Sequence, residues 1–125
     1  MKSQEIQALK EKFGKGNVLS TACPSREILA TLTSKWSILI LMALSENDVM
    51  RFSDLRRKVE GISEKMLGQT LKNLEKYGFV NRHAYDIVPP KVEYSLTDNG
   101  VMARDKIFSL VGWIEDNVFD LMEIN

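Results

Sequence analysis

The residue with the most reactive side chain is the single cysteine, Cys23, which stands directly before Pro24 at the expected start of a helix. The positive end of a helix dipole favours a thiolate, and Arg26 can add positive charge. A thiolate is the form that oxidants and electrophiles attack. Without a second cysteine, the available products are a disulfide between subunits, a mixed disulfide or an alkylated thiol. A purely structural, buried Cys23 stays equally open, because free cysteine is often buried.

No other residue pattern indicates catalysis or metal binding. His83 is the only histidine, and no second histidine or cysteine lies near it in the sequence to share a metal ion. A thiol enzyme would need a base beside Cys23, and no histidine is close to it in the sequence. We therefore expect a protein that is not an enzyme and that has no catalytic residue, metal or cofactor.

A second group of useful side chains lies on a helix expected from Ser63 to Tyr77. At about 100° per residue, its apolar and polar residues gather on opposite sides. The apolar side comprises Leu67, Thr70, Leu71 and Leu74, and the polar side comprises Lys65, Gly68, Gln69, Lys72 and Lys76. A polar face without bulky apolar groups suits the major groove of DNA. An ordinary surface helix shows the same pattern, so the pattern alone does not decide between them.

Each polar position of this helix suits a particular contact with DNA. Gln69 can make paired hydrogen bonds to an adenine edge, and Gly68 allows the backbone to approach closely. The three lysines suit phosphates, and Ser63 with the helix N-terminus can bind a further phosphate. The helix is therefore the expected reading element.

The segment before this helix completes a helix-turn-helix. Ser53 is expected to cap a short helix through Val59, and the turn at residues 60–62 is brief. Residues 50–52 can add a short strand to a sheet. Arg51, Ser53 and Arg56 are further candidates for DNA contacts.

The segment after this helix predicts a β-hairpin. Two strand-like runs between Val80 and Leu96 flank Pro89 and Pro90, which cannot sit inside a sheet ladder. Arg82 lies at the base of this hairpin and is expected to contact DNA. Lys91 lies beside the proline turn, where it can reach a phosphate or the minor groove. A helix followed by a basic hairpin is the arrangement of a winged helix.

The net charge of zero conceals an uneven distribution. Residues 51–82 carry eight basic and four acidic side chains, whereas residues 98–125 carry six acidic and two basic ones. A basic middle segment suits a nucleic-acid partner. The alternative is that both segments are simply solvated faces.

The remaining helices are expected to build the core and a dimer interface. A helix from Lys35 to about Glu46 looks buried over most of its surface, with Trp36 and Leu39 among its apolar residues. A helix from Thr97 to about Met122 carries more apolar surface than a small domain can bury. We expect it, with an amphipathic helix at residues 4–13, to pair with a second chain. Folding back onto its own domain is the alternative.

Length and composition fit one soluble domain. The chain has 125 residues, of which 44% are hydrophobic and 27% charged. No apolar run reaches the roughly 18 residues of a membrane span, and the start lacks the apolar core of a signal peptide. A single cysteine agrees with a reducing compartment, so a cytoplasmic protein without membrane contact is expected.

Several motifs resemble the HxlR-type transcriptional regulators, a family similar to the MarR-type proteins. The matching segments are Cys23-Pro24, Lys35-Trp36, residues 51–57, Gly61-Ile62-Ser63, Met66-Leu67, Gln69, Leu74-Glu75, Gly78, residues 88–97 and Gly100. Together they span about residues 23–115. Lys91 stands where an arginine is frequent, which keeps the charge and loses the bidentate geometry. The resemblance implies bacterial winged-helix homodimers on palindromic promoter DNA, some of which sense quinones, aldehydes or hypochlorite through a cysteine in the Cys-Pro position.

The expected fold is therefore mainly α with a small β-hairpin: a winged helix-turn-helix with N- and C-terminal dimerisation helices. Residues 1–125 are expected to form a single domain, with residues 51–96 as helix-turn-helix and wing, and residues 1–22 and 97–125 as dimer interface. The expected function is a homodimeric repressor on a palindromic operator, responsive to a small electrophile or oxidant through Cys23. Control by a non-covalent ligand, with a structural Cys23, is the alternative. A winged helix for RNA or protein contacts alone is the other rival.

Overall fold

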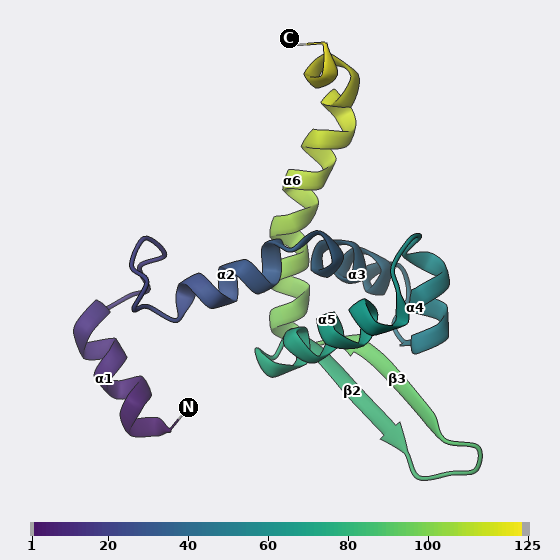
Figure 1. Ribbon diagram of the computed structural model, residues 1–125, viewed down its shortest axis with the longest axis horizontal. Helices are drawn as coiled ribbons and strands as arrows, with labels where there is room; N and C mark the ends of the chain where they lie inside the picture. Colours follow the sequence, from purple (N-terminus) through teal and green to yellow (C-terminus); the bar gives the residue numbers. More distant parts are fainter. Residues whose placement is uncertain (1, 124–125) are drawn as a thin grey trace. The chain divides into compact units, whose positions relative to one another are not determined.

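The computed structural model describes residues 2–123 and divides the chain into two compact units, one up to Ser34 and one from Lys35 onward. The first unit holds α1 (Ser3–Phe13) and α2 (Ser25–Thr33). The second unit holds α3 (Lys35–Glu46), β1 (Met50–Arg51), α4 (Phe52–Lys58), α5 (Glu64–Lys76), β2 (Val80–Tyr85), β3 (Lys91–Leu96) and α6 (Asp98–Met122). Within the second unit, the β2–β3 hairpin projects beyond α5 (Figure 1).

The three strands form one antiparallel sheet in the order β1-β3-β2. In the central row, Tyr94 of β3 lies between Met50 of β1 and Arg82 of β2. Met50 and Tyr94 are buried, so this side of the sheet faces the core. Because side chains alternate along a strand, Glu93 and its neighbours in the sheet lie on the opposite side. The short strand expected near residue 50 is thus confirmed.

The core of the second unit is built around α3, which packs against α4, α5, α6 and β3. Its fully buried side chains are mostly leucines from successive helices, where burial of apolar surface stabilises the fold. They include Ile40, Leu41, Leu55, Leu67, Leu71, Leu74 and Val80. The burial expected for α3 was overestimated at two positions, because Leu39 is exposed and Trp36 is half-buried.

The boundaries of α5 follow from its flanking residues. At its start, the Ser63 hydroxyl accepts the Met66 N–H at 3.0 Å, which satisfies one of the free donors of the first turn. After its end, Gly78 has a φ of 75°, a left-handed conformation that glycine adopts without strain. This turn reverses the chain into β2. The capping role expected of Ser63 is confirmed.

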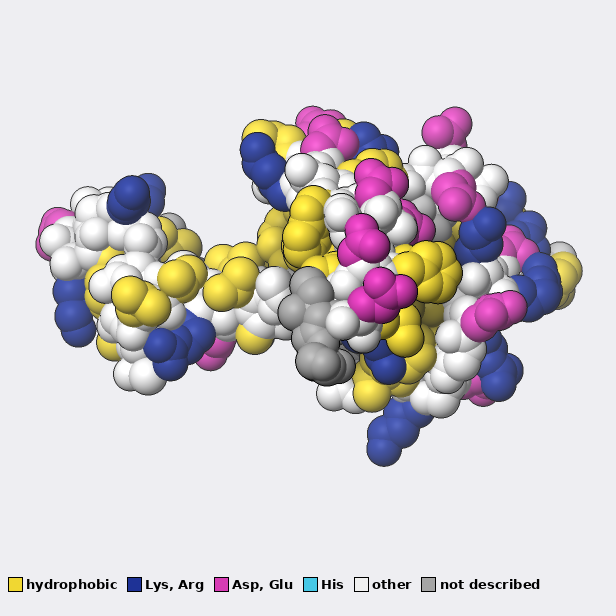
Figure 2. All heavy atoms as spheres, turned by 90° about the horizontal axis from the view of Figure 1, so that it is seen from above, with side chains coloured by type: hydrophobic (Ala, Val, Ile, Leu, Met, Phe, Trp, Pro, Cys, Tyr) yellow, Lys and Arg dark blue, Asp and Glu magenta, His cyan; other side chains and the backbone are white. Residues whose placement is uncertain are grey.

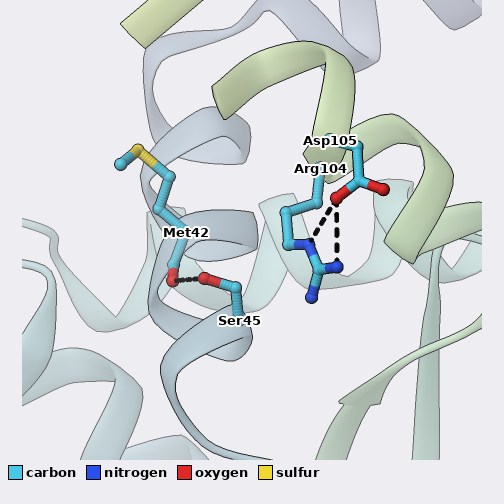
Figure 3. Close-up of polar contacts among 4 residues, drawn as sticks. All are labelled: Met42, Ser45, Arg104 and Asp105. Carbon is cyan, nitrogen blue, oxygen red and sulfur yellow. Dashed lines mark hydrogen bonds and ion pairs between the residues drawn. The ribbon is translucent and has the colours of Figure 1, made fainter. Parts of the chain in front are cut away.

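The first turn of α6 is fixed against the start of the wing. The Thr97 hydroxyl accepts the Gly100 N–H at 2.9 Å and donates to the Gly78 carbonyl. The Thr97 N–H also donates to the Phe79 carbonyl at 3.2 Å. The next turns of α6 pass alongside α3, where Arg104 and Asp105 form an ion pair and the Ser45 hydroxyl of α3 bonds its own helix (Figure 3).

The second half of α6 leaves the body of this unit (Figure 1). Large hydrophobic side chains remain exposed along it, including Trp113 at 55% and Phe119 at 76%. Figure 2 looks onto this end and shows hydrophobic side chains beside acidic ones. Among the described residues, α6 therefore carries apolar surface that this unit does not cover.

The expected fold class, mainly α with a small sheet, is confirmed, and one expected helix start is wrong. Helix α4 begins at Phe52, not after Ser53, which lies exposed in its first turn. Arg51 takes the capping position, and the carboxylate of Asp54, the third helical residue, accepts the Arg51 N–H at 3.3 Å. In the described part of the chain, no single helix is long and apolar enough to cross a membrane.

Candidate nucleic-acid interface and thiol site

The outer side of α5 is exposed as the sequence predicted. Leu67, Thr70, Leu71 and Leu74 are buried, whereas Lys65, Gln69, Lys72 and Lys76 are exposed. Because the opposite side of α5 is packed in the core, this polar face is held towards solvent.

A groove of about 730 Å³ runs between α5 and the sheet. It brings together most of the α5 residues predicted to contact DNA and adds Arg82 from β2. The residues that line it are Glu64, Lys65, Gly68, Gln69, Leu71, Lys72, Glu75, Arg82 and Tyr94. Arg82 reaches this groove because it pairs with Tyr94, whose side of the sheet faces α5. The groove thus contains three cations and two carboxylates.

The wing carries its cations on both sides of the sheet. All residues from Asn81 to Pro90 are exposed. Lys91 lies on the side opposite Arg82, with its Nζ 2.8 Å from Glu93 Oε1 and 4.8 Å from the centre of the Tyr85 ring. This hydrogen bond from Lys91 lowers the pKa of the Glu93 carboxyl. Lys91 is therefore held within the sheet, not free at the proline turn.

The basic run before α5 is also paired with carboxylates. Arg56 Nη1 lies 2.7 Å from Glu64 Oε1, and Lys58 Nζ lies 2.6 Å from Glu46 Oε2. Arg57 binds Asp54 in the same helix. The sequence analysis did not predict these ion pairs, although acidic residues lie close to the basic ones in the sequence.

The other predicted DNA-contact residues lie around this surface. Lys76 is near the C-terminal end of α5, 5.2 Å from the Tyr77 ring centre. Arg51 pairs with Glu93 in the sheet, so it shares the side of the wing that holds Lys91. The groove between α5 and the sheet does not include Arg51, Ser53, Arg56, Ser63, Lys76 or Lys91.

The thiol of Cys23 lies in the first unit and is 5% exposed. Its Sγ accepts the Asn17 N–H at 3.3 Å and the Ser25 hydroxyl at 3.1 Å. The bond from the Asn17 backbone, followed by that from Ser25, lowers the pKa of the thiol. Arg26 was expected to help, but its guanidinium instead donates to the carbonyls of Val18 and Leu19. Cys23 is thus almost fully buried, and it also has two hydrogen-bond donors that stabilise its thiolate form.

A mostly apolar hollow of about 280 Å³ adjoins this thiol. Side chains of α1 and of the start of α2 form its walls, together with the glycine-containing loop between them. The lining residues are Ile6, Leu9, Lys10, Phe13, Gly14, Lys15, Gly16, Cys23, Pro24, Ser25 and Ile28. In the described residues, no cluster of histidine, cysteine or acidic side chains could hold a metal ion.

Comparison with known proteins decides the family. The model of the HxlR-like helix-turn-helix matches residues 31–121. The chain belongs to this family. It is therefore a helix-turn-helix transcriptional regulator, a DNA-binding class of protein, and not an enzyme.

Individual relatives agree with this assignment. YtfH of Escherichia coli, an HTH-type transcriptional regulator of uncharacterised role, is 50% identical over 94% of this HxlR-like chain and 92% of its own. A structure of a candidate regulator, YtfH from Salmonella typhimurium, is 52% identical with a TM-score of 0.81 and covers 86% of this chain and 96% of its own. The structure of the redox regulator HypR in its reduced form is 33% identical, with a TM-score of 0.72. The match covers 79% of this chain and 97% of the HypR chain.

Proposed function

We propose that this HxlR-like regulator binds palindromic promoter DNA as a homodimeric repressor, and that Cys23 couples DNA binding to oxidants or electrophiles. The observation that carries the DNA part is the two-sided character of α5. Its apolar side is buried in the core, and its exposed side carries lysines and a glutamine; among its large apolar residues only Met66, 38% exposed, reaches solvent. That is the surface a major groove accepts.

The groove beside α5 supports a division of labour among its residues. Lys65, Lys72 and Arg82 carry charge to the DNA backbone, where phosphate contacts position the protein. Gln69 reads an adenine edge through its two hydrogen-bonding groups. Gly68 lets the helix backbone approach the bases because it has no side chain, and a Cβ added there would meet only Phe52, at 4.0 Å.

The exposed apolar residues of α6 support the homodimer. Trp113, Ile114 and Phe119 would leave water if α6 paired with its copy in a second chain. A two-fold pair places two α5 helices on one face of the duplex, about 34 Å apart, and so favours a palindromic site.

The surroundings of Cys23 support the sensing part. Donors from Asn17 and Ser25 stabilise the thiolate, which is the reactive form towards electrophiles and oxidants. The apolar hollow beside the sulfur gives room for a small electrophile next to the thiol. A relative of similar fold, HypR, is a redox regulator.

A second candidate, control by a non-covalent ligand with a structural Cys23, has one observation in its favour. The thiol is almost fully buried, and its two hydrogen bonds join the loop at Asn17 to the start of α2. In that case the hollow of about 280 Å³ would take the ligand without a covalent bond.

One experiment separates these proposals. Fluorescence anisotropy measures binding of the reduced protein to DNA upstream of its own gene, before and after treatment with diamide or a quinone. We expect tight, salt-sensitive binding that weakens on treatment, and no response in Cys23→Ser. An equal response in Cys23→Ser would refute the sensor, and binding no tighter than to arbitrary DNA would refute the operator.

A further inference from the structure

We infer that Glu64 and Glu93 are negative determinants of DNA affinity: they neutralise Arg56 and Lys91 on the DNA-binding surface and so restrict binding to arbitrary sequences. This inference rests on the proposed function and assigns two acidic residues a part in selectivity. The basis is that some cations of this surface form an ion pair with a carboxylate and others do not.

The first pair joins α4 to the start of α5. Arg56 Nη1 and Glu64 Oε1 lie 2.7 Å apart, and both side chains are largely in solvent, with 50% and 70% exposed. Glu64 is the first residue of α5 and lines the groove between α5 and the sheet. A carboxylate at this position occupies the helix end where a phosphate would otherwise bind. It thus opposes a DNA backbone and also neutralises the nearest arginine.

The second pair lies on the outer side of the wing. Lys91 Nζ and Glu93 Oε1 lie 2.8 Å apart, and the Glu93 side chain is 15% exposed. Glu93 is also the register partner of Arg51 in β1 and of His83 in β2. The Glu93 carboxylate therefore lies between Arg51 and His83 across the sheet and two residues from Lys91 along its own strand. The lowered pKa of Glu93 keeps it ionised at neutral pH.

The remaining cations differ. Among the described residues, Lys65, Lys72 and Arg82 have no carboxylate within ion-pair distance, and all three line the groove. The surface thus contains free cations beside α5, whereas Arg56 and Lys91 outside the groove are neutralised. The affinity for arbitrary DNA therefore comes mainly from the cations that have no carboxylate partner.

Salt dependence makes this arrangement measurable. Each phosphate that a free cation neutralises releases condensed counterions and adds about −0.9 to the slope of log K against log salt concentration. When Arg56 or Lys91 moves from its carboxylate to a phosphate, the carboxylate is left unpaired beside the DNA. It then attracts a counterion of its own, so the net release is near zero. Replacing the carboxylate by an amide restores the release.

The test compares Glu64→Gln, Glu93→Gln and a matched control, Asp105→Asn, in the dimeric full-length protein. Asp105 also pairs with an arginine, Arg104 at 3.0 Å (Figure 3), and its variant changes the net charge equally, on α6 and outside the groove between α5 and the sheet. Anisotropy titrations use a short duplex of arbitrary sequence at salt concentrations from about 50 to about 200 mM. Circular dichroism and light scattering confirm that each variant is folded and dimeric.

We expect each of Glu64→Gln and Glu93→Gln to tighten binding of the arbitrary duplex about fivefold per chain, the factor for one unit charge at contact distance in water, and so up to about 25-fold in the dimer, which carries the change twice. The salt slope should steepen by up to about 0.9 per chain. Asp105→Asn should match the wild type. Unchanged or weaker binding in both glutamine variants, with salt-dependent binding by the wild type, overturns this inference alone. A wild type whose weak binding does not respond to salt overturns the proposed function with it.

Discussion

Gly100 offers the sharpest test of how α6 is fixed to the wing. A Cβ built on this residue would lie 2.1 Å from the Phe79 carbonyl oxygen, 3.1 Å from its carbon and 3.3 Å from the Leu96 side chain. The nearest atom belongs to the backbone and therefore cannot rotate away. The Phe79 carbonyl also accepts the Thr97 N–H, so moving it disturbs the start of α6. Gly100→Ala must shift either the helix or the turn before β2.

The expected magnitude follows from two opposing terms. Alanine in place of a helical glycine stabilises by about 1 kcal/mol through helix propensity. Overpacking against rigid neighbours costs about 1–3 kcal/mol, and the contact with a backbone atom places Gly100→Ala at the upper end. The net loss is about 2 kcal/mol of unfolding free energy. For a chain of this size that corresponds to a melting temperature lower by about 5–10 °C.

Gly68→Ala is the matched control, because Gly68 is also inside a helix but has only Phe52 at 4.0 Å from an added Cβ. It gains the same propensity term without the clash, so it should be more stable than the wild type. Urea unfolding of both variants, followed by circular dichroism, measures the difference at about 3 kcal/mol. If Gly100→Ala proves as stable as Gly68→Ala, the described docking of α6 onto Phe79 is wrong.

Three further predictions concern the cap, the thiol and the dimer. Thr97→Val removes the hydroxyl that accepts the Gly100 N–H and should lower the unfolding free energy by about 1 kcal/mol in urea titrations; an unchanged midpoint would contradict the cap. Because Asn17 and Ser25 lower the pKa of Cys23, its alkylation rate by iodoacetamide should reach half its maximum at a lower pH in the folded protein than in the urea-unfolded chain. Coincident pH profiles would show that these donors do not stabilise the thiolate. Phe119→Asp should yield monomers in light scattering at micromolar concentration, and a dimer that persists would place the interface elsewhere.

Much of the fold could be predicted because local patterns and tertiary packing agree. The alternation of apolar and polar residues along α5 predicted which side is buried, and Ser63 marked its start. The paired prolines predicted the wing turn between β2 and β3. The start of α4 could not be predicted in the same way, since Ser53 is a good cap by residue type. Asp54, the third residue of the helix, instead accepts the Arg51 N–H, and Arg51 takes the capping position.

The candidate site was less predictable because it depends on distances between elements. The sequence predicted that Lys65, Gln69 and Lys72 share a face, but not that Arg82 joins them across the groove. Nor does the sequence reveal that Lys91 is held by Glu93. Strand alternation puts both side chains on one side of β3, but the contact of Lys91 with the ring of Tyr85 depends on the pairing of β3 with β2. The donors to Cys23 similarly come from the fold of the loop at Asn17.

Whether α5 reads DNA is measured by the ratio of two affinities, one for DNA upstream of the protein's own gene and one for an arbitrary duplex. Titrations of the wild type, Gln69→Ala and Lys72→Ala are compared at several salt concentrations. We expect Gln69→Ala to lower this ratio by a factor of roughly 5 to 150, which corresponds to about 1–3 kcal/mol, because one base contact is lost. We expect Lys72→Ala to weaken both complexes alike and to make the salt slope shallower by about 1. If both variants keep the wild-type affinities for the two DNAs, and therefore the wild-type ratio, α5 is not the reading helix.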